Sequence, residues 1–114
     1  MDLSNSYHRA ALMFFLSATL HVVVIVLSGA TYLVSMVSGL LICVILALGL
    51  MRQWRWLAYF AFLVALAGAI VAFGFAMAEF GPVQTAFFGI ALADLAAALI
   101  LFGVLWRSAP KVET

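Results

Sequence analysis

The stretch "WLAYFAFLVALAGAIVAFGFAMA", residues 56–78, contains no charged side chain. A helix that crosses the hydrocarbon core of a bilayer needs about 20 predominantly apolar residues, at a rise of about 1.5 Å per residue. Three further apolar runs of this kind lie at residues 10–28, 32–51 and 83–106. In lipid, each backbone polar group must be paired within its own segment, which favours helices. The sequence therefore predicts an all-α integral membrane protein, a four-transmembrane-helix up-down bundle forming a single membrane domain over residues 1–114.

The overall composition agrees with this interpretation. Of the 114 residues, 69% are apolar and only 8% are charged, whereas ordinary soluble domains contain roughly 25% charged residues. A soluble chain of this length has too much surface for its volume to hide so many apolar side chains. We therefore expect the lipid bilayer to be the main surrounding of this protein.

The positions of the basic residues predict an orientation. Arg9 precedes the first span, Arg52 and Arg55 lie between the second and third, and Arg107 and Lys111 follow the fourth. The loops "SGAT" and "EFGPVQ" contain no Lys or Arg. Because basic residues accumulate in cytoplasmic loops, both termini are expected on the cytoplasmic side of an inner, or cytoplasmic, type of membrane. The loops are short, so consecutive helices are expected to be antiparallel neighbours.

Small residues form stripes on two of the spans, and these stripes are candidate helix-packing seams. Helices in lipid associate through close backbone approach, which small side chains permit. The seam of the third span consists of Ala58, Ala61, Ala65, Gly68 and Ala72, and that of the fourth consists of Gly89, Ala93, Ala96 and Gly103. We expect these seams to serve packing inside the bundle, the alternative being contact with another copy or another protein.

Two polar residues stand out inside the spans. Asp94 lies about twelve residues, or roughly 18 Å, before Trp106, and His21 lies about the same distance after Arg9. Both are therefore expected near the bilayer centre, on helices that are neighbours in an up-down bundle. An unpaired aspartate at this depth costs about 2.5–3.5 kcal/mol. The sequence thus predicts a buried polar pair of His21 and Asp94, facing inward.

Three roles are open for this pair. It is a structural contact that fixes the register of the bundle, or a proton- or cation-coupling site, for which intramembrane Asp and His are typical. In the third, His21 ligates the metal of a tetrapyrrole such as a haem, although no second ligand is evident. We expect no other cofactor and no metal site. Glu79 is expected at the interface, or as the outer mouth of a pathway to Asp94. Cys43 is expected to be a packing residue.

Motifs that are absent from the sequence exclude several classes of function. No nucleophile-and-base arrangement and no phosphate-binding loop is present, so we expect no enzyme. The basic residues are explained by topology and are too few for a nucleic-acid surface. The sequence favours a small non-catalytic accessory or assembly subunit that packs against a larger membrane complex. The alternative is a small homo-oligomeric transporter or channel, with Asp94 and His21 as its proton- or cation-coupling site.

Overall fold

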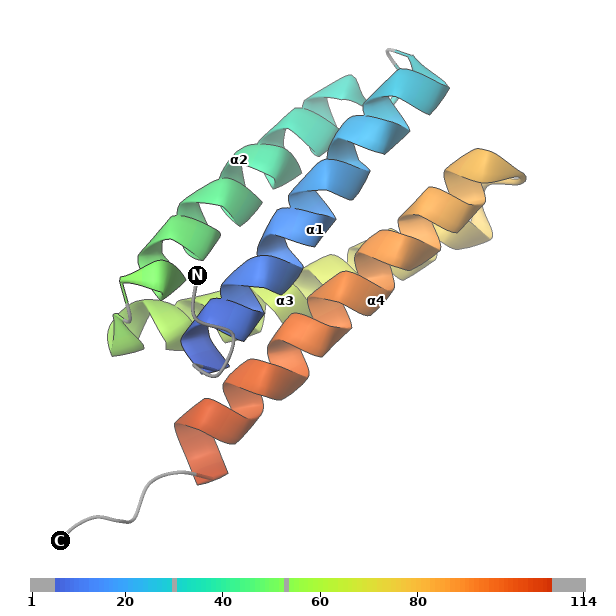
Figure 1. Ribbon diagram of the computed structural model, residues 1–114. Coiled ribbons are helices and arrows are strands. Elements are labelled where there is room, and N and C mark those ends of the chain that lie inside the picture. The colour runs from blue at the N-terminus through green and yellow to red at the C-terminus, as the bar shows by residue number, and fades with distance from the viewer. Residues whose placement is uncertain (1–5, 30, 53, 108–114) are drawn as a thin grey trace, which may run out of the picture.

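The computed structural model describes residues 6–29, 31–52 and 54–107, so Lys111 lies outside the described residues. The chain forms four α-helices, α1 (Ser6–Ser28), α2 (Leu33–Met51), α3 (Arg55–Met77) and α4 (Pro82–Phe102), followed by a π-helical turn at Gly103–Arg107 (Figure 1). Each helix is long and apolar enough to cross a membrane. The four expected helices are therefore confirmed, with the first beginning four residues earlier than expected.

Helix ends follow the local sequence. Pro82 occupies the first turn of α4, where its missing N–H removes no helical hydrogen bond. The preceding Gly81 has a φ of 74°, a left-handed value that glycine adopts at little cost. At the other end of α4, the Leu105 carbonyl in the π-helical turn accepts a hydrogen bond from Arg55, with N and O 3.2 Å apart. This contact links the start of α3 to the π-helical turn.

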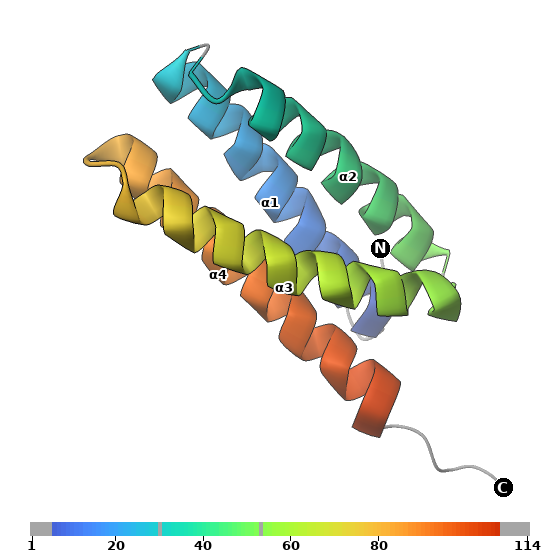
Figure 2. The same ribbon diagram turned by 180° about the vertical axis from the view of Figure 1, so that it is seen from behind.

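The helices are not arranged in chain order. α1 packs against α2 on one side and α4 on the other, and α3 packs against α4, whereas α2 and α3 make few contacts. Figure 2 shows that the end of α2 and the start of α3 lie together at their short connection, and that the two helices diverge from there. The expectation that all consecutive helices are neighbours is therefore wrong for α2 and α3.

The central position of α1 and α4 explains this departure. The buried residues of α4 form one broad face, which includes Ala86, Ala93 and Ala97. The α1 face that is buried includes Ala10, Ala11, Ala18 and the fully buried Ser17. These small side chains let α1 and α4 approach closely. The short loop holds only one pair of helix ends together, so the middle parts of α2 and α3 are free to separate.

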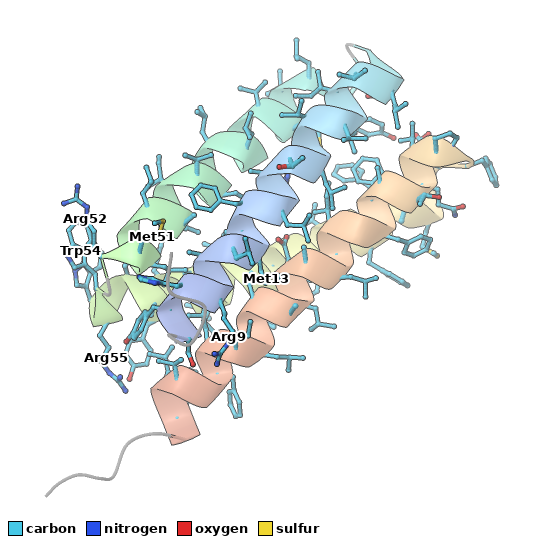
Figure 3. The ribbon with its side chains drawn as sticks, viewed as in Figure 1. Arg9, Met13, Met51, Arg52, Trp54 and Arg55 are labelled. Atoms are coloured by element: carbon cyan, nitrogen blue, oxygen red, sulfur yellow. The ribbon has the colours of Figure 1, made fainter. Side chains whose placement is uncertain are left out.

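The described arginines near the helix ends and Glu79 lie at opposite ends of the bundle. Arg9, Arg52 and Arg55 gather at one end, which we call the arginine end (Figure 3). Trp54 stacks on Trp56 there, with ring centroids 5.9 Å apart. Glu79 lies after α3, at the opposite end, which we call the Glu79 end. This separation agrees with the charge pattern that the orientation rule uses.

The buried core is divided at mid-length. One apolar cluster fills the arginine half and includes Phe14, Leu50 and Leu101, and a second fills the Glu79 half and includes Val24 and Phe87. Between them lie the buried polar residues, which are Ser17, His21 and Asp94. A polar layer therefore interrupts an otherwise apolar interior.

The predicted seams occupy two kinds of position. The alanines of the α3 seam, namely Ala58, Ala61, Ala65 and Ala72, are buried, and Gly68 lies directly against Asp94. In the α4 seam, Ala93 is buried, Ala96 and Gly103 are half-buried, and Gly89 contacts Leu20 of α1. The small residues of α3 and α4 thus lie where these helices approach their neighbours.

Candidate functional site

A cavity of about 380 Å³ lies between α2 and α3, where these helices diverge. Its floor consists of residues from α1 and α4, and its walls come from α2 and α3. Several wall residues are exposed, including Ser38 and Ile42 on α2 and Val71 on α3. The cavity is therefore open sideways, through a gap between α2 and α3.

Both ends of the cavity are closed by contacts between α2 and α3. At the arginine end, Leu57 packs so closely on Gly49 that a Cβ atom there would overlap the Leu57 side chain. At the Glu79 end, the Tyr32 hydroxyl donates a hydrogen bond to Glu79 Oε2. The Tyr32 ring also makes edge contacts with Phe75 and Phe87, which line the cavity, with centroids 5.2 Å apart in each case. The opening is thus a window of limited length.

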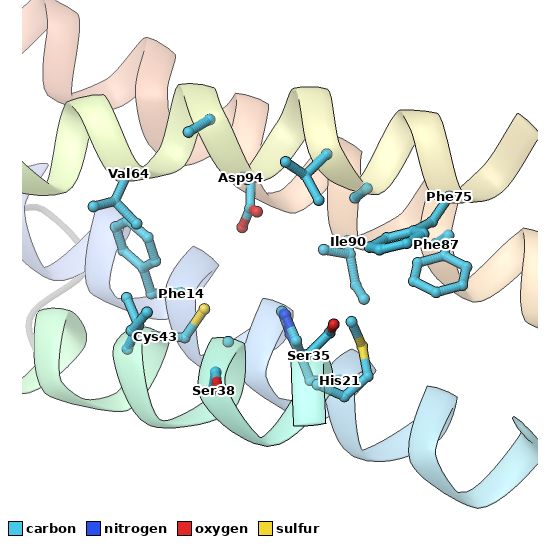
Figure 4. A pocket seen from close by; sticks show the side chains of 17 residues that line it. Phe14, His21, Ser35, Ser38, Cys43, Val64, Phe75, Phe87, Ile90 and Asp94 are labelled. Atoms are coloured by element: carbon cyan, nitrogen blue, oxygen red, sulfur yellow. The ribbon is translucent and has the colours of Figure 1, made fainter. Parts of the chain in front are cut away.

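Asp94 projects from the middle of α4 into this cavity (Figure 4). Its side chain is only 4% exposed, and its Oδ1 atom has no hydrogen-bond partner among the described residues. Its carboxylate accepts a hydrogen bond from the Ser17 hydroxyl of α1. Oδ2 lies 2.5 Å from the position that a Cβ of residue 68 would occupy, so Gly68 provides the space for the carboxylate. One carboxylate oxygen therefore remains available as an acceptor inside the cavity.

His21 of α1 lies across the cavity from Asp94 and is 7% exposed (Figure 4). Its Nδ1 is 2.6 Å from the backbone carbonyl oxygen of Ser17. A carbonyl oxygen only accepts hydrogen bonds, so Nδ1 carries a hydrogen and donates it. In the neutral ring, Nε2 is then an acceptor. Nε2 lies beside Gly39 of α2, where a Cβ would be 2.5 Å away.

The structure brings His21 and Asp94 to one cavity but does not join them by a hydrogen bond within the described residues. The Ser17 carbonyl holds the imidazole against α2, whereas the Asp94 carboxylate lies beside α3. Ser17 connects the two, because its carbonyl binds His21 and its hydroxyl binds Asp94. The Cys43 thiol, which is buried, is also 3.7 Å from the Ser17 hydroxyl oxygen. The direct His21–Asp94 contact expected from depth alone is replaced by this arrangement around Ser17.

Glu79 lies at the end of the cavity and not along its wall. By accepting the hydrogen bond of Tyr32, it ties the residue before α2 to the residues after α3. The Tyr32 pKa is raised by this hydrogen bond, by partial burial and by the charge of Glu79. Glu79 thus closes this end of the cavity in the conformation observed.

Three contributors to the site were missed by the sequence reasoning. The sequence pattern assigns no role to Ser17, whose carbonyl binds His21, or to Tyr32, whose hydroxyl binds Glu79. The third contributor is Gly39, which provides space for the imidazole. The available signal was spacing, because Ser17 lies one helical turn before His21 and faces the same side of α1.

The described residues contain no group of three or more His, Cys, Asp or Glu side chains that could hold a metal ion. No protein-family model matches the chain, and no curated protein or solved structure matches it. Functional inference therefore depends on the geometry of the cavity.

Proposed function

We propose that this chain is a small membrane transporter that uses Asp94 as its proton- or cation-coupling group. One observation carries the proposal, namely the Asp94 Oδ1 atom, which is buried, lacks a hydrogen-bond partner among the described residues, and faces a cavity with a sideways opening. A carboxyl group that served only to fix the bundle would be expected to have its acceptors satisfied.

The energetic cost of Asp94 supports a functional role. An aspartate at the centre of a membrane helix costs about 2.5–3.5 kcal/mol, and the cost is reduced when the group is protonated or paired with a cation. A carboxyl group in this position exchanges one stabilising partner, a proton, for another, a bound cation. Such an exchange is the elementary step of coupled transport.

The cavity also has dimensions suited to a ligand. Small-molecule sites are usually apolar concavities of about 300–1,000 Å³ with a few polar groups that fix orientation. The cavity of about 380 Å³ has apolar walls together with His21 and Asp94. The gap between α2 and α3 provides a route from the surrounding lipid, if the bundle is inserted with its helices across the membrane.

The proposal is tested with the purified protein in lipid vesicles that maintain a pH gradient. Apolar compounds of several classes (amines, quaternary ammonium ions, neutral carbonyl compounds and carboxylic acids) are added, and the internal pH is followed with a trapped dye. We expect at least one class to dissipate the gradient faster with the wild-type protein than with Asp94→Asn or with empty vesicles. Equal rates for every class would contradict the proposal.

A second candidate is the accessory subunit of a larger membrane complex. What favours it is a separate apolar groove of about 510 Å³ on the outer side of α3 and α4, bordered by Ala69, Phe73, Phe88 and Ala91. Small residues between aromatic side chains are suited to contact with another transmembrane helix. The native mass after mild solubilisation distinguishes the candidates. Larger unrelated proteins in fixed ratio support the subunit, and a homo-oligomer supports the transporter.

A further inference from the structure

The central cavity contains an imbalance of hydrogen-bonding groups, which indicates what kind of ligand it accepts. Asp94 Oδ1 is an acceptor without a partner among the described residues. His21 Nε2 is an acceptor in the neutral ring, because Nδ1 donates its hydrogen to the Ser17 carbonyl. The Ser17 hydroxyl donates to Asp94 and is therefore already used. The buried polar layer thus offers acceptors and lacks donors.

In the part of the chain that the structure describes, the cavity also lacks a positively charged arginine or lysine side chain near Asp94. The arginines that the structure describes with their side chains, Arg9, Arg52 and Arg55, lie at the arginine end, near the ends of their helices. Asp94 lies at the midpoint of the span Pro82–Trp106. Within the described residues, no salt bridge neutralises its carboxylate, and no Lys or Arg side chain lines the cavity. A positive charge for Asp94 must therefore come from the ligand.

From these observations we infer that the cavity binds an apolar molecule bearing a protonated amine with N–H groups. The ammonium donates to Asp94 Oδ1 and to His21 Nε2. The side chains of these two residues line the cavity from opposite sides (Figure 4). The apolar part of the ligand contacts the surrounding walls, including Ile42, Val64 and Ile90. This inference names the substrate class of the site described above and depends on the proposed function only for transport, not for binding.

Other occupants fit the same observations less well. A quinone or another carbonyl compound brings acceptors to a cavity that already has an excess of them. A lipid headgroup is excluded by depth, because Asp94 is at the midpoint of its span. A continuous partner helix is blocked, since α2 and α3 are joined at one end by the packing of Leu57 on Gly49 and at the other by the hydrogen bond of Tyr32 to Glu79. A small amphipathic amine passes through the window without breaking either contact.

The test uses four ligands with one apolar body, namely naphthylmethylamine and its N-methyl, N,N-dimethyl and N,N,N-trimethyl forms. All carry one positive charge when protonated or alkylated, but the number of N–H donors falls stepwise to none. Binding is measured calorimetrically with wild-type protein in nanodiscs, after subtraction of the signal from empty nanodiscs. We expect affinity to fall along the series, with the trimethyl form at least about tenfold weaker than the primary amine, because hydrogen bonds to charged groups are among the stronger ones.

Two variants make the test specific. Asp94→Asn is expected to weaken the primary amine about tenfold or more and to leave the neutral analogue naphthylmethanol nearly unchanged. If Asp94→Asn does not fold, Gly68→Ala replaces it, because its added Cβ displaces the Asp94 carboxylate. Gly74→Ala is the matched control on the same helix, since a Cβ there meets nothing within 4 Å. Its amine affinity should equal that of the wild type.

The outcomes separate this inference from the proposed function. Equal affinity for all four ligands, or amine binding that neither Asp94→Asn nor Gly68→Ala weakens, would overturn the inference. Selective amine binding without any Asp94-dependent change in the pH gradient would support the inference and contradict transport. An Asp94-dependent gradient change with quaternary or neutral compounds alone would support transport and overturn the amine assignment.

Discussion

Gly68→Ala should destabilise the protein more than the chemically identical change at Gly74. Both glycines lie inside α3, so the gain in helix propensity, about 0.5–1 kcal/mol, is common to both and cancels in the comparison. At residue 68 the new Cβ would lie 2.5 Å from Asp94 Oδ2 and 3.4 Å from Asp94 Cγ. The oxygen must move away by roughly 1 Å to reach ordinary van der Waals contact.

The expected magnitude follows from the environment of Asp94. Inserting a methyl group into a close contact typically costs about 1–3 kcal/mol. Movement of the carboxylate also weakens its hydrogen bond from Ser17, which is worth about 0.5–1.5 kcal/mol. Since Asp94 relaxes partly, we expect Gly68→Ala to be less stable than Gly74→Ala by about 1–3 kcal/mol, or roughly 5- to 150-fold in the unfolding equilibrium.

The assay is equilibrium unfolding in mixed micelles by titration with a denaturing detergent. Tryptophan fluorescence serves as the signal, because Trp54 and Trp56 lie at the arginine end, away from the substitutions. Wild-type protein is the common reference for both variants. If Gly68→Ala is as stable as Gly74→Ala, the close approach of Asp94 to α3 is not a feature of the folded protein, and the description of the cavity floor is wrong.

Three further predictions concern the polar contacts and the orientation. A double-mutant cycle of Ser17→Ala with Asp94→Asn should give a coupling energy of about 0.5–1.5 kcal/mol, because the two side chains share a hydrogen bond. A cycle of His21 with Asp94 should give less than about 0.5 kcal/mol. A larger energy for the second cycle would indicate a direct His21–Asp94 contact. The pKa of Tyr32 is raised in the folded state. The neutral hydroxyl therefore stabilises the fold fully below about pH 10, and this stabilisation is lost as the pH rises through the folded-state pKa. Detergent unfolding at increasing alkaline pH should show the loss in the wild type and not in Tyr32→Phe. Green fluorescent protein fused to either terminus should fluoresce, as expected for cytoplasmic ends, and a dark fusion that is nevertheless inserted would refute the predicted orientation.

The helices could be predicted from the sequence, but not all of their neighbours. Four apolar runs separated by Gly, Pro and Arg residues define the spans, because burial in lipid requires long apolar segments. A stripe of small residues, in contrast, does not indicate which helix it packs against. The stripe containing Ala61 and Gly68 suits any adjacent helix, and it packs mainly against α4. The separation of α2 from α3 results from competition among several such interfaces.

The sequence predicted the depth at which His21 and Asp94 lie along their helices, but not the contacts that they make. Counting residues from the ends of the spans placed His21 and Asp94 in the same layer, because the helical rise is constant. The direction of each side chain depends also on local acceptors, and the Ser17 carbonyl, one turn before His21, binds the imidazole first. Whether Glu79 contacts Tyr32 depends on how α2 and α3 converge at that end, which no local pattern specifies.

The order of the helices also makes the molecule a pair of helical hairpins, α1 with α2 and α3 with α4, docked through α1 and α4. Within the described residues, the hairpins also meet at the Leu57–Gly49 contact and around Tyr32, which bonds Glu79 and packs on two phenylalanine rings. A small rotation about the α1–α4 seam would therefore widen the window without unfolding either hairpin. Asp94 and Ser17 lie on opposite sides of that seam, so such a rotation would stretch the hydrogen bond that joins them.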